Sequence, residues 1–402
     1  MLFRQIVGQK ELIKSLIKAV SLGRIPHAQL FWGPEGNEKL ALALAYAQYI
    51  NCANRLYASQ GADLGGLSSD SCGQCPSCRK FEKLVHPDLH FFYPNNINGG
   101  SVKKDSQSLD YIDLWRETVL KNEAEFSYNE WIERMDIGNR QAIINIRDCG
   151  QILQTLSLKS SEARFRVIVI WMIEKLSPTI ASTLLKTLEE PEPQTVFLLV
   201  SENTDQILPT ILSRTQMVKV PRIENADIER HLSARGVEAE TAHRAAEESS
   251  GNLITARLRC SHNEIRENFH SSFADWMRLC FRVDMPALVA FSERQSALGR
   301  ENLKFFFEHC MDEIHACLLM GNHCADRVFA DAEEKKFWTN FSKFVTGENI
   351  HHYYKIFDDA IFAVGRNAHV PTLITDMSME LCRILAAAQQ ALKRKAGNDA
   401  KA

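Results

Sequence analysis

Four cysteines are spaced so that their side chains could share one metal ion. Cys72, Cys75 and Cys78 form a C-x-x-C-x-x-C pattern, and Cys52 stands earlier, at the end of a predicted helix. Thiolates at this spacing can converge on one ion without strain, and a closed structural zinc site takes four ligands. The pattern therefore predicts a structural Zn²⁺ in a module at about residues 52–78. A catalytic zinc is disfavoured because four thiolates leave no open position.

The fourth ligand and the metal stay open at this point. The span from Cys52 to the cysteine triplet is long, and residues 61–71 look like an added loop. His86 is therefore an alternative fourth ligand. An iron–sulfur cluster is the rival metal centre, and four cysteines without a metal are the remaining interpretation.

A second candidate site is a degenerate phosphate-binding loop at residues 33–40. The complete pattern is G-x-x-x-x-G-K-[ST] between a strand and a helix, and this segment has that context. Gly33 and Lys39 fit the pattern, and Gly36 lies inside the loop. Glu38 replaces the second glycine, and Leu40 replaces the hydroxyl residue that would bind Mg²⁺.

Both replacements oppose nucleotide binding. A carboxylate inside a phosphate cradle repels the anion and competes for the amide donors, and leucine offers Mg²⁺ no oxygen. We therefore expect that ATP does not bind productively. An ordinary strand–turn–helix with a chance lysine is the alternative interpretation.

The following apolar run, residues 166–171, also ends without the acidic residues of a nucleotide hydrolase. Such enzymes use acidic side chains to hold Mg²⁺ and orient water. Here Trp171 and Met172 stand at these positions, and neither side chain can act as a base. Glu174 comes later and is expected to be a solvated residue at the start of a helix.

Strands and helices alternate through the first half of the chain and must position these groups. Buried strands are predicted at residues 28–33, 88–94, 166–171, 195–201 and 217–220. Continuous apolar strands separated by helices indicate a parallel sheet covered on both faces. Residues 95–140 interrupt the order, and we interpret them as a surface insertion with helices near 109–121 and 127–135.

The strand signals stop at about Pro221, and the remaining chain reads as helical. The predicted fold class is thus α/β followed by all-α. We expect an α/β domain at residues 1–221, a small helical domain at 222–262 and a larger helical domain at 263–402. In the last, an apolar stripe runs from Leu303 to Leu318 at helical spacing.

The composition is that of an ordinary soluble globular protein. Of 402 residues, 45% are hydrophobic and 24% charged, with a net charge of -3. A nearly neutral chain has no global basic field for binding DNA by itself. No apolar run suits a signal peptide or reaches the roughly 18 residues that a membrane helix needs. We expect a cytoplasmic protein without a membrane partner.

Three segments resemble the clamp-loader subunits of bacterial DNA polymerase III, which are AAA+-type proteins. Residues 26–34 resemble the start of their ATPase domains. Residues 184–191 read L-L-K-T-L-E-E-P, as in the gamma/tau and delta-prime subunits, and residues 207–214 match the stretch that ends in their S-R-C motif. The resemblance covers about residues 1–260 and implies an AAA+-like P-loop domain, a lid domain and a C-terminal collar domain.

The departures from the gamma/tau pattern place the chain with the delta-prime subunits, whose nucleotide sites are degenerate. They stand at Glu38, Leu40, Trp171, Met172 and Ile254. The last follows a Gly-Asn turn where gamma subunits carry a sensing arginine. The family also has a four-cysteine zinc module at this place in its fold.

Arg214 is kept where other site residues are lost. The S-R-C motif reads Ser213-Arg214-Thr215 here. The resemblance implies that Ser213 and Arg214 face the ATP site of a neighbouring subunit, where an arginine neutralises charge that develops on the γ-phosphate. A salt-bridged surface arginine is the alternative.

The resemblance further implies a hetero-pentameric ring with gamma/tau and delta subunits. In this ring the chain would support ATP-driven loading of the sliding clamp onto primed DNA, as a non-catalytic member. Two other functions stay open: a catalytically active gamma/tau-like ATPase, and a nucleic-acid-binding module that uses the zinc knob.

Overall fold

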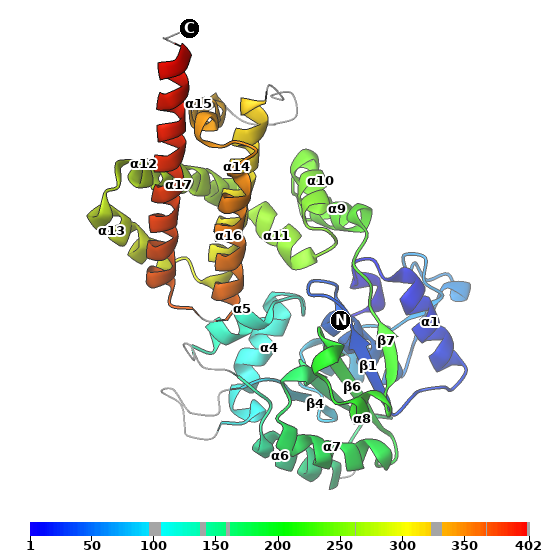
Figure 1. Ribbon diagram of the computed structural model, residues 1–402. Helices are drawn as coiled ribbons and strands as arrows, with labels where there is room; N and C mark the ends of the chain where they lie inside the picture. The colour runs from blue at the N-terminus through cyan, green and yellow to red at the C-terminus, as the bar shows by residue number, and fades with distance from the viewer. Residues whose placement is uncertain are drawn as a thin grey trace. The chain divides into compact units, whose positions relative to one another are not determined.

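The chain folds into two compact units, Met1–Cys260 and Ser261–Ala402, in a computed structural model (Figure 1). The structure describes residues 1–95, 106–136, 142–157, 161–261, 263–322, 332–366 and 368–399.

The first unit is built on a five-stranded parallel sheet in the order β4-β5-β6-β1-β7. Its strands are β1 (Ala28–Trp32), β4 (Leu89–Phe92), β5 (Arg166–Trp171), β6 (Thr195–Ser201) and β7 (Gln216–Lys219). Every residue of β5 and β6 is buried, as expected for parallel strands covered on both faces. The predicted fold class, α/β followed by all-α, is confirmed.

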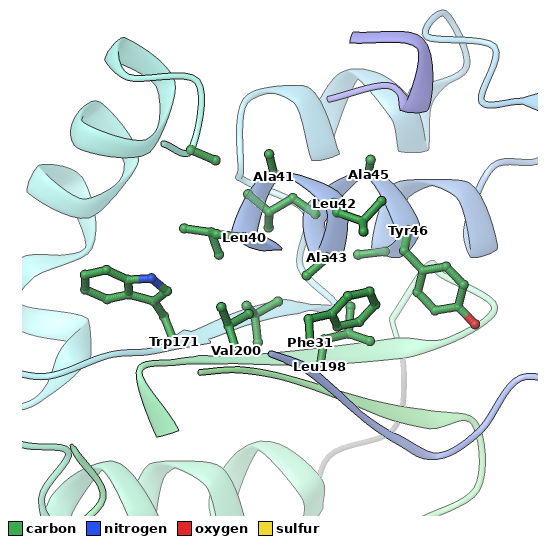
Figure 2. Packing of buried hydrophobic residues seen from close by; sticks show 14 of the residues in the cluster. Phe31, Leu40, Ala41, Leu42, Ala43, Ala45, Tyr46, Trp171, Leu198 and Val200 are labelled. Carbon is green, nitrogen blue, oxygen red and sulfur yellow. The ribbon is translucent and has the colours of Figure 1, made fainter. Parts of the chain in front are cut away.

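Helices cover both faces of this sheet because alternate residues of each strand are buried on opposite sides. Trp171 belongs to one apolar cluster and its neighbour Ile170 to another. Figure 2 shows Trp171 and Val200 directed from the strands toward α2, which is buried along its whole length. The first cluster includes residues of α1 (Lys10–Ser21), α2 (Lys39–Ile50), α3 (Pro76–Glu82) and α4 (Ile112–Lys121); the second includes residues of α6 (Ile146–Ser157), α7 (Pro178–Glu189) and α8 (Pro209–Leu212).

The expectation that residues 95–140 form a surface insertion is corrected, because the described helices of this segment contribute residues to the core. It contains η3 (Ser108–Tyr111), α4 and α5 (Tyr128–Arg134), while residues 96–105 and 137–140 lie outside the described residues. Trp115 of α4 and Trp131 of α5 are fully buried. The ring of Trp115 stacks on Tyr93 with centroids 4.1 Å apart. The helices were predicted, but their spacing did not show that tryptophans would anchor them to the sheet.

Three further helices complete the first unit: α9 (Asn225–Ala234), α10 (Ala239–Glu248) and α11 (Leu253–Ser261). They share a small apolar cluster of their own, which also takes in Val7 from the segment before α1. The division of this unit into a domain at 1–221 and a lid at 222–262 stays a prediction.

In its described residues the second unit consists of helices joined by turns. Its helices are α12 (Asn263–Arg282), α13 (Met285–Ser296), α14 (Arg300–Gly321), α15 (Ala332–Phe341), α16 (Ile350–Gly365) and α17 (Val370–Asp399). The predicted stripe lies on α14, where Leu303 and Ile314 are buried and Leu318 is half-buried. In the described part of the chain, no helix has both the length and the apolar character to cross a membrane.

Candidate functional site

The degenerate phosphate loop connects β1 to α2 and is tightly packed. A Cβ on Gly33 would lie 2.1 Å from the carbonyl oxygen of Val220. A Cβ on Gly36 would lie 1.8 Å from Oδ1 of Asn252, which precedes α11. Both positions therefore require glycine. Gly36 (φ 72°) and Glu38 (φ 67°) also have left-handed backbone conformations.

The ammonium group of Lys39 is held by partners within the chain. Its Nζ donates to the carbonyl oxygen of Pro34 at 2.9 Å and lies 3.1 Å from Oε1 of Glu202. The Lys39 side chain is only 5% exposed, so a phosphate could reach it only by replacing Glu202. Glu202 follows β6 and was not singled out from the sequence, because nothing near it indicates a pairing with a loop so distant along the chain.

Glu38 is buried, but its carboxylate does not take the amides of its own loop. Oε2 of Glu38 accepts a hydrogen bond from the Val7 amide at 3.0 Å. Burial raises the pKa of Glu38 well above its usual value, and the nearby Glu125 carboxylate raises it further. This corrects the expectation that Glu38 competes for the loop amides, because its carboxyl group is bound to Val7, outside the loop.

Apolar packing fills the positions where an active relative would bind Mg²⁺. Leu40 and Trp171 are 3% and 2% exposed, and Figure 2 shows the two side chains facing each other between α2 and the sheet. The Trp171 ring lies 5.1 Å from that of Phe126. Met172 is buried with a φ of 57°. Ile254, at the expected sensing position, is also buried.

Glu174 is not the solvated residue that the sequence suggested. It lies in the turn η4 (Ile173–Lys175), and its Oε1 accepts hydrogen bonds from the amides of Glu202 and Asn203 at 2.8 and 3.3 Å. Burial raises the pKa of Glu174. The carboxyl group thus fixes the chain where β6 ends, beside the partner of Lys39.

Ser213 and Arg214 follow the short helix α8 at the surface. Nη1 of Arg214 donates to the carbonyl oxygen of Thr210 at 3.1 Å and to Oγ of Ser213 at 3.3 Å. Nη2 of Arg214 forms an ion pair with Glu189, the last residue of α7. The Arg214 side chain is 36% exposed. In the chain by itself, Arg214 thus has an acidic partner and an accessible guanidinium.

The four predicted metal-ligating cysteines come together in the first unit. The sulfurs of Cys52, Cys72, Cys75 and Cys78 all lie within 4.8 Å of one another. The distance from Cys72 Sγ is 3.6 Å to Cys52 Sγ and 3.9 Å to Cys78 Sγ. His86 lies outside this group, and its Nδ1 accepts a hydrogen bond from the Asp88 amide. Cys52 is therefore the residue that folding brings to the triplet.

Backbone amides surround these sulfurs. The Cys75 amide donates to Cys72 Sγ at 3.3 Å, and the Cys78 amide donates to Cys75 Sγ at 3.4 Å. A hydrogen bond from Cys78 lowers the pKa of Cys52 to about 5, against the effect of burial. Four sulfurs with amide donors suit a soft cation with tetrahedral coordination, which matches the chemistry of Zn²⁺.

Comparison with known proteins shows the family to which the chain belongs. The family described as DNA polymerase III, delta subunit matches residues 8–224, more than half of the chain. The chain belongs to this family. Its matched region begins before the phosphate loop and ends just after β7.

The relatives of this chain are named as three different subunits of DNA polymerase III. The chain is 28% identical over 230 residues to the DNA polymerase III subunit gamma of Buchnera aphidicola, covering 57% of this chain and 48% of the relative. It is 26% identical over 241 residues to subunit tau of Escherichia coli, covering 60% and 29%. It is 25% identical over 256 residues to subunit delta' of Bacillus subtilis, covering 64% and 60%. The chain thus spans between about a third and three fifths of these relatives.

Proposed function

We propose that this chain is a non-catalytic, delta-prime-like subunit of the DNA polymerase III clamp loader. The observation that carries the proposal is the state of the phosphate loop. Lys39 is paired with Glu202, and the position for Mg²⁺ is filled by Leu40 against Trp171. A metal-dependent phosphoryl transfer needs both an accessible lysine and a Mg²⁺ ligand, so this loop does not support one.

In this role the chain would support ATP-driven loading of the sliding clamp onto primed DNA in the bacterial cytoplasm. Its partners would be gamma/tau and delta subunits in a hetero-pentameric ring, with residues 263–402 as the collar domain. Supporting this are the family of the chain and relatives that are named gamma, tau and delta'.

Arg214 would complete the ATP site of a neighbouring gamma/tau subunit, with Ser213 beside it. An arginine suits this task because its charge is permanent and its fork can contact two phosphate oxygens. Glu189 would hold the guanidinium in the free chain and release it when the neighbour's nucleotide arrives. Because the pair is partly exposed, exchanging one partner for another costs little.

The test is Arg214→Ala in a reconstituted loader that contains gamma/tau, delta, clamp and primed DNA. Removing an arginine finger lowers turnover at the served site by about 10³–10⁵-fold. The DNA-stimulated ATPase rate of the loader should therefore lose the contribution of that one site, while the complex still assembles. Steady-state phosphate release and gel filtration measure the two quantities.

Arg230→Ala is the matched control, because Arg230 is an exposed arginine whose ion pair with Asp227 lies within α9. It should leave the ATPase rate unchanged. An equal rate for Arg214→Ala and the wild type would refute the role of Arg214 in trans.

We also propose that the four cysteines hold a structural Zn²⁺. The supporting observation is the convergence of four sulfurs, with Cys78 fully buried and Cys52 and Cys75 almost so. A site closed by four thiolates has no position for substrate, so the ion would stabilise the module at residues 52–78.

An active gamma/tau-like ATPase is the second candidate, because two of the relatives above are named gamma and tau. Equilibrium binding of labelled ATP to the chain alone separates the two functions. Saturable, Mg²⁺-dependent binding with turnover would support the ATPase and refute the non-catalytic role.

A further inference from the structure

Residues 122–126 lie between the phosphate loop and the helices α9 and α11. They follow α4 in a tight turn, in which Glu123 and Ala124 have φ angles of 55° and 63°. The amide of Ala124 donates to the carbonyl oxygen of Val119 at 2.7 Å, and that of Glu125 donates to Asn122 at 2.9 Å. The turn is closed by its own hydrogen bonds and presents Glu125 to the interior.

Glu125 meets the groups that would hold a phosphate. In a working phosphate loop, backbone amides and the lysine cradle the phosphates. Here the charge of Lys39 and a hydrogen bond from the Glu38 amide both act on the Glu125 carboxylate. Glu125 is 7% exposed. Burial raises the pKa of Glu125 to about 7, and its carboxyl group takes the place that an external anion would have beside this lysine and amide.

The same turn is tied to the helices that follow the sheet domain. Nη1 of Arg257, on α11, donates to the carbonyl oxygen of Asn122 at 3.1 Å. Arg235, which follows α9, forms an ion pair with Glu123. Phosphate loop, turn and helices thus form a connected set of contacts.

The loop and α11 also touch directly. The amide of Leu253, the first residue of α11, donates to the carbonyl oxygen of Gly36 at 2.8 Å. On the other side, Phe126 packs its ring against Trp171, with centroids 5.1 Å apart. The turn is therefore anchored to the sheet as well as to the helices.

We propose that residues 122–126 are an internal plug that takes the place of a nucleotide and holds α9–α11 against the phosphate loop without any ligand. This gives the insertion a role that the clamp-loader proposal does not contain. The plug keeps the first unit in one arrangement while neighbouring subunits bind and release ATP.

Charge at the plug also disfavours a competing nucleotide. Lys39 is already paired with Glu202 and is also close enough to act on Glu125, while burial raises the pKa of Glu38 and Glu125. A triphosphate entering this space would have to displace these acidic groups from Lys39, and in a buried setting its charge would be poorly screened from them.

Hydrogen exchange of the full chain tests the plug through Arg257→Ala. Loss of the bond to Asn122 should speed exchange by about fivefold in peptides covering 119–127, because the turn opens more often. The same increase should appear at 33–42, because the plug holds the phosphate loop through Glu125. Peptides of β5 and β6 should not change. Arg259→Ala is the matched control, because Arg259 lies on the same helix and pairs with Glu248 of α10.

Equal exchange for Arg257→Ala and Arg259→Ala, or an increase confined to α9–α11, would overturn the plug. If Arg257→Ala also speeds exchange in β5 and β6, it destabilises the whole unit, and Arg235→Ala replaces it as the test. Arg235 forms an exposed ion pair with Glu123, and its loss must speed exchange at 119–127 if the plug is correct.

Adding Mg²⁺ and ATP to the wild type separates this inference from the proposed function. Bound nucleotide that speeds exchange at 119–127 would refute the inactive site but support the location of the plug. Bound nucleotide that leaves 119–127 unchanged would refute both. We expect no binding and no change.

Discussion

Among single residues, the four cysteines give the sharpest prediction. Cys75 contributes a sulfur to the cluster and is the N-cap residue before α3, where its Sγ accepts a hydrogen bond from the Cys78 amide. A serine at this position cannot supply the thiolate that zinc binds. Metal analysis should find about one zinc per chain in the wild type and far less in Cys75→Ser, because a closed site needs its full ligand set.

Cys260→Ser is the control, since Cys260 is a half-buried cysteine that stands apart from the cluster. It should keep the zinc content of the wild type. Full zinc content in Cys75→Ser would contradict the assignment of Cys75 as a ligand.

Among elements, the helix α4 supplies the most informative test. Trp115 on this helix is fully buried and contacts the rings of Tyr93, Phe126 and Trp171. Replacing a buried tryptophan by alanine removes apolar contacts and leaves a cavity, at a cost of about 3–5 kcal/mol. Trp115→Ala should therefore lower the urea concentration at which half of the first unit is unfolded, as measured by circular dichroism.

Leu120→Ala on the same helix is the comparison, because Leu120 is 49% exposed. Its effect should stay within about 0.5 kcal/mol, as for most surface substitutions. If the two substitutions cost the same, α4 is a surface feature after all and the plug loses its anchor.

In the whole molecule, the two units should respond to pH in opposite directions. Burial raises the pKa of Glu125 in the first unit to about 7, from an ordinary 4.5. In the second unit, burial opposes ionisation of Glu313, but hydrogen bonds from His270 and His309 outweigh it and lower the pKa to about 2. Trp338 also donates to Glu313, at 2.5 Å, so this buried carboxylate is held by donors of its own unit.

The sign of each effect follows from proton binding. The folded first unit holds its proton on Glu125 more tightly than the unfolded chain, so its stability should fall as pH rises from about 4.5 through 7. The folded second unit holds its proton on Glu313 less tightly, so its stability should fall as pH drops from 4.5 toward 2.

Calorimetric scans of the chain between pH 3 and 8 measure both trends. Glu125→Gln should flatten the dependence of the first unit near neutrality, and Glu313→Gln that of the second unit in acid. Unchanged slopes in these variants would show that other groups control the response.

Much of the fold could be predicted because its strongest signals are local. The strands β5 and β6 appear in the sequence as continuous apolar runs, since both of their faces are buried. The place of the insertion could not be predicted, because local spacing shows that a segment is helical but not what the helix packs against. Helical spacing around Trp115 indicates a helix, but a helix packed on a sheet and one packed on the surface share that spacing.

The chemical groups of the site follow directly from the order of the residues: no Mg²⁺ ligand at Leu40 or Trp171, four thiols at metal-binding spacing, and one arginine at position 214. Folding cannot supply a group that the chain lacks. The contacts of these groups depend on the folded chain, which pairs Glu202 with Lys39 and brings Glu125 to the loop. Those partners lie far apart along the chain, and it is packing of the sheet, α4 and α11 that brings them together.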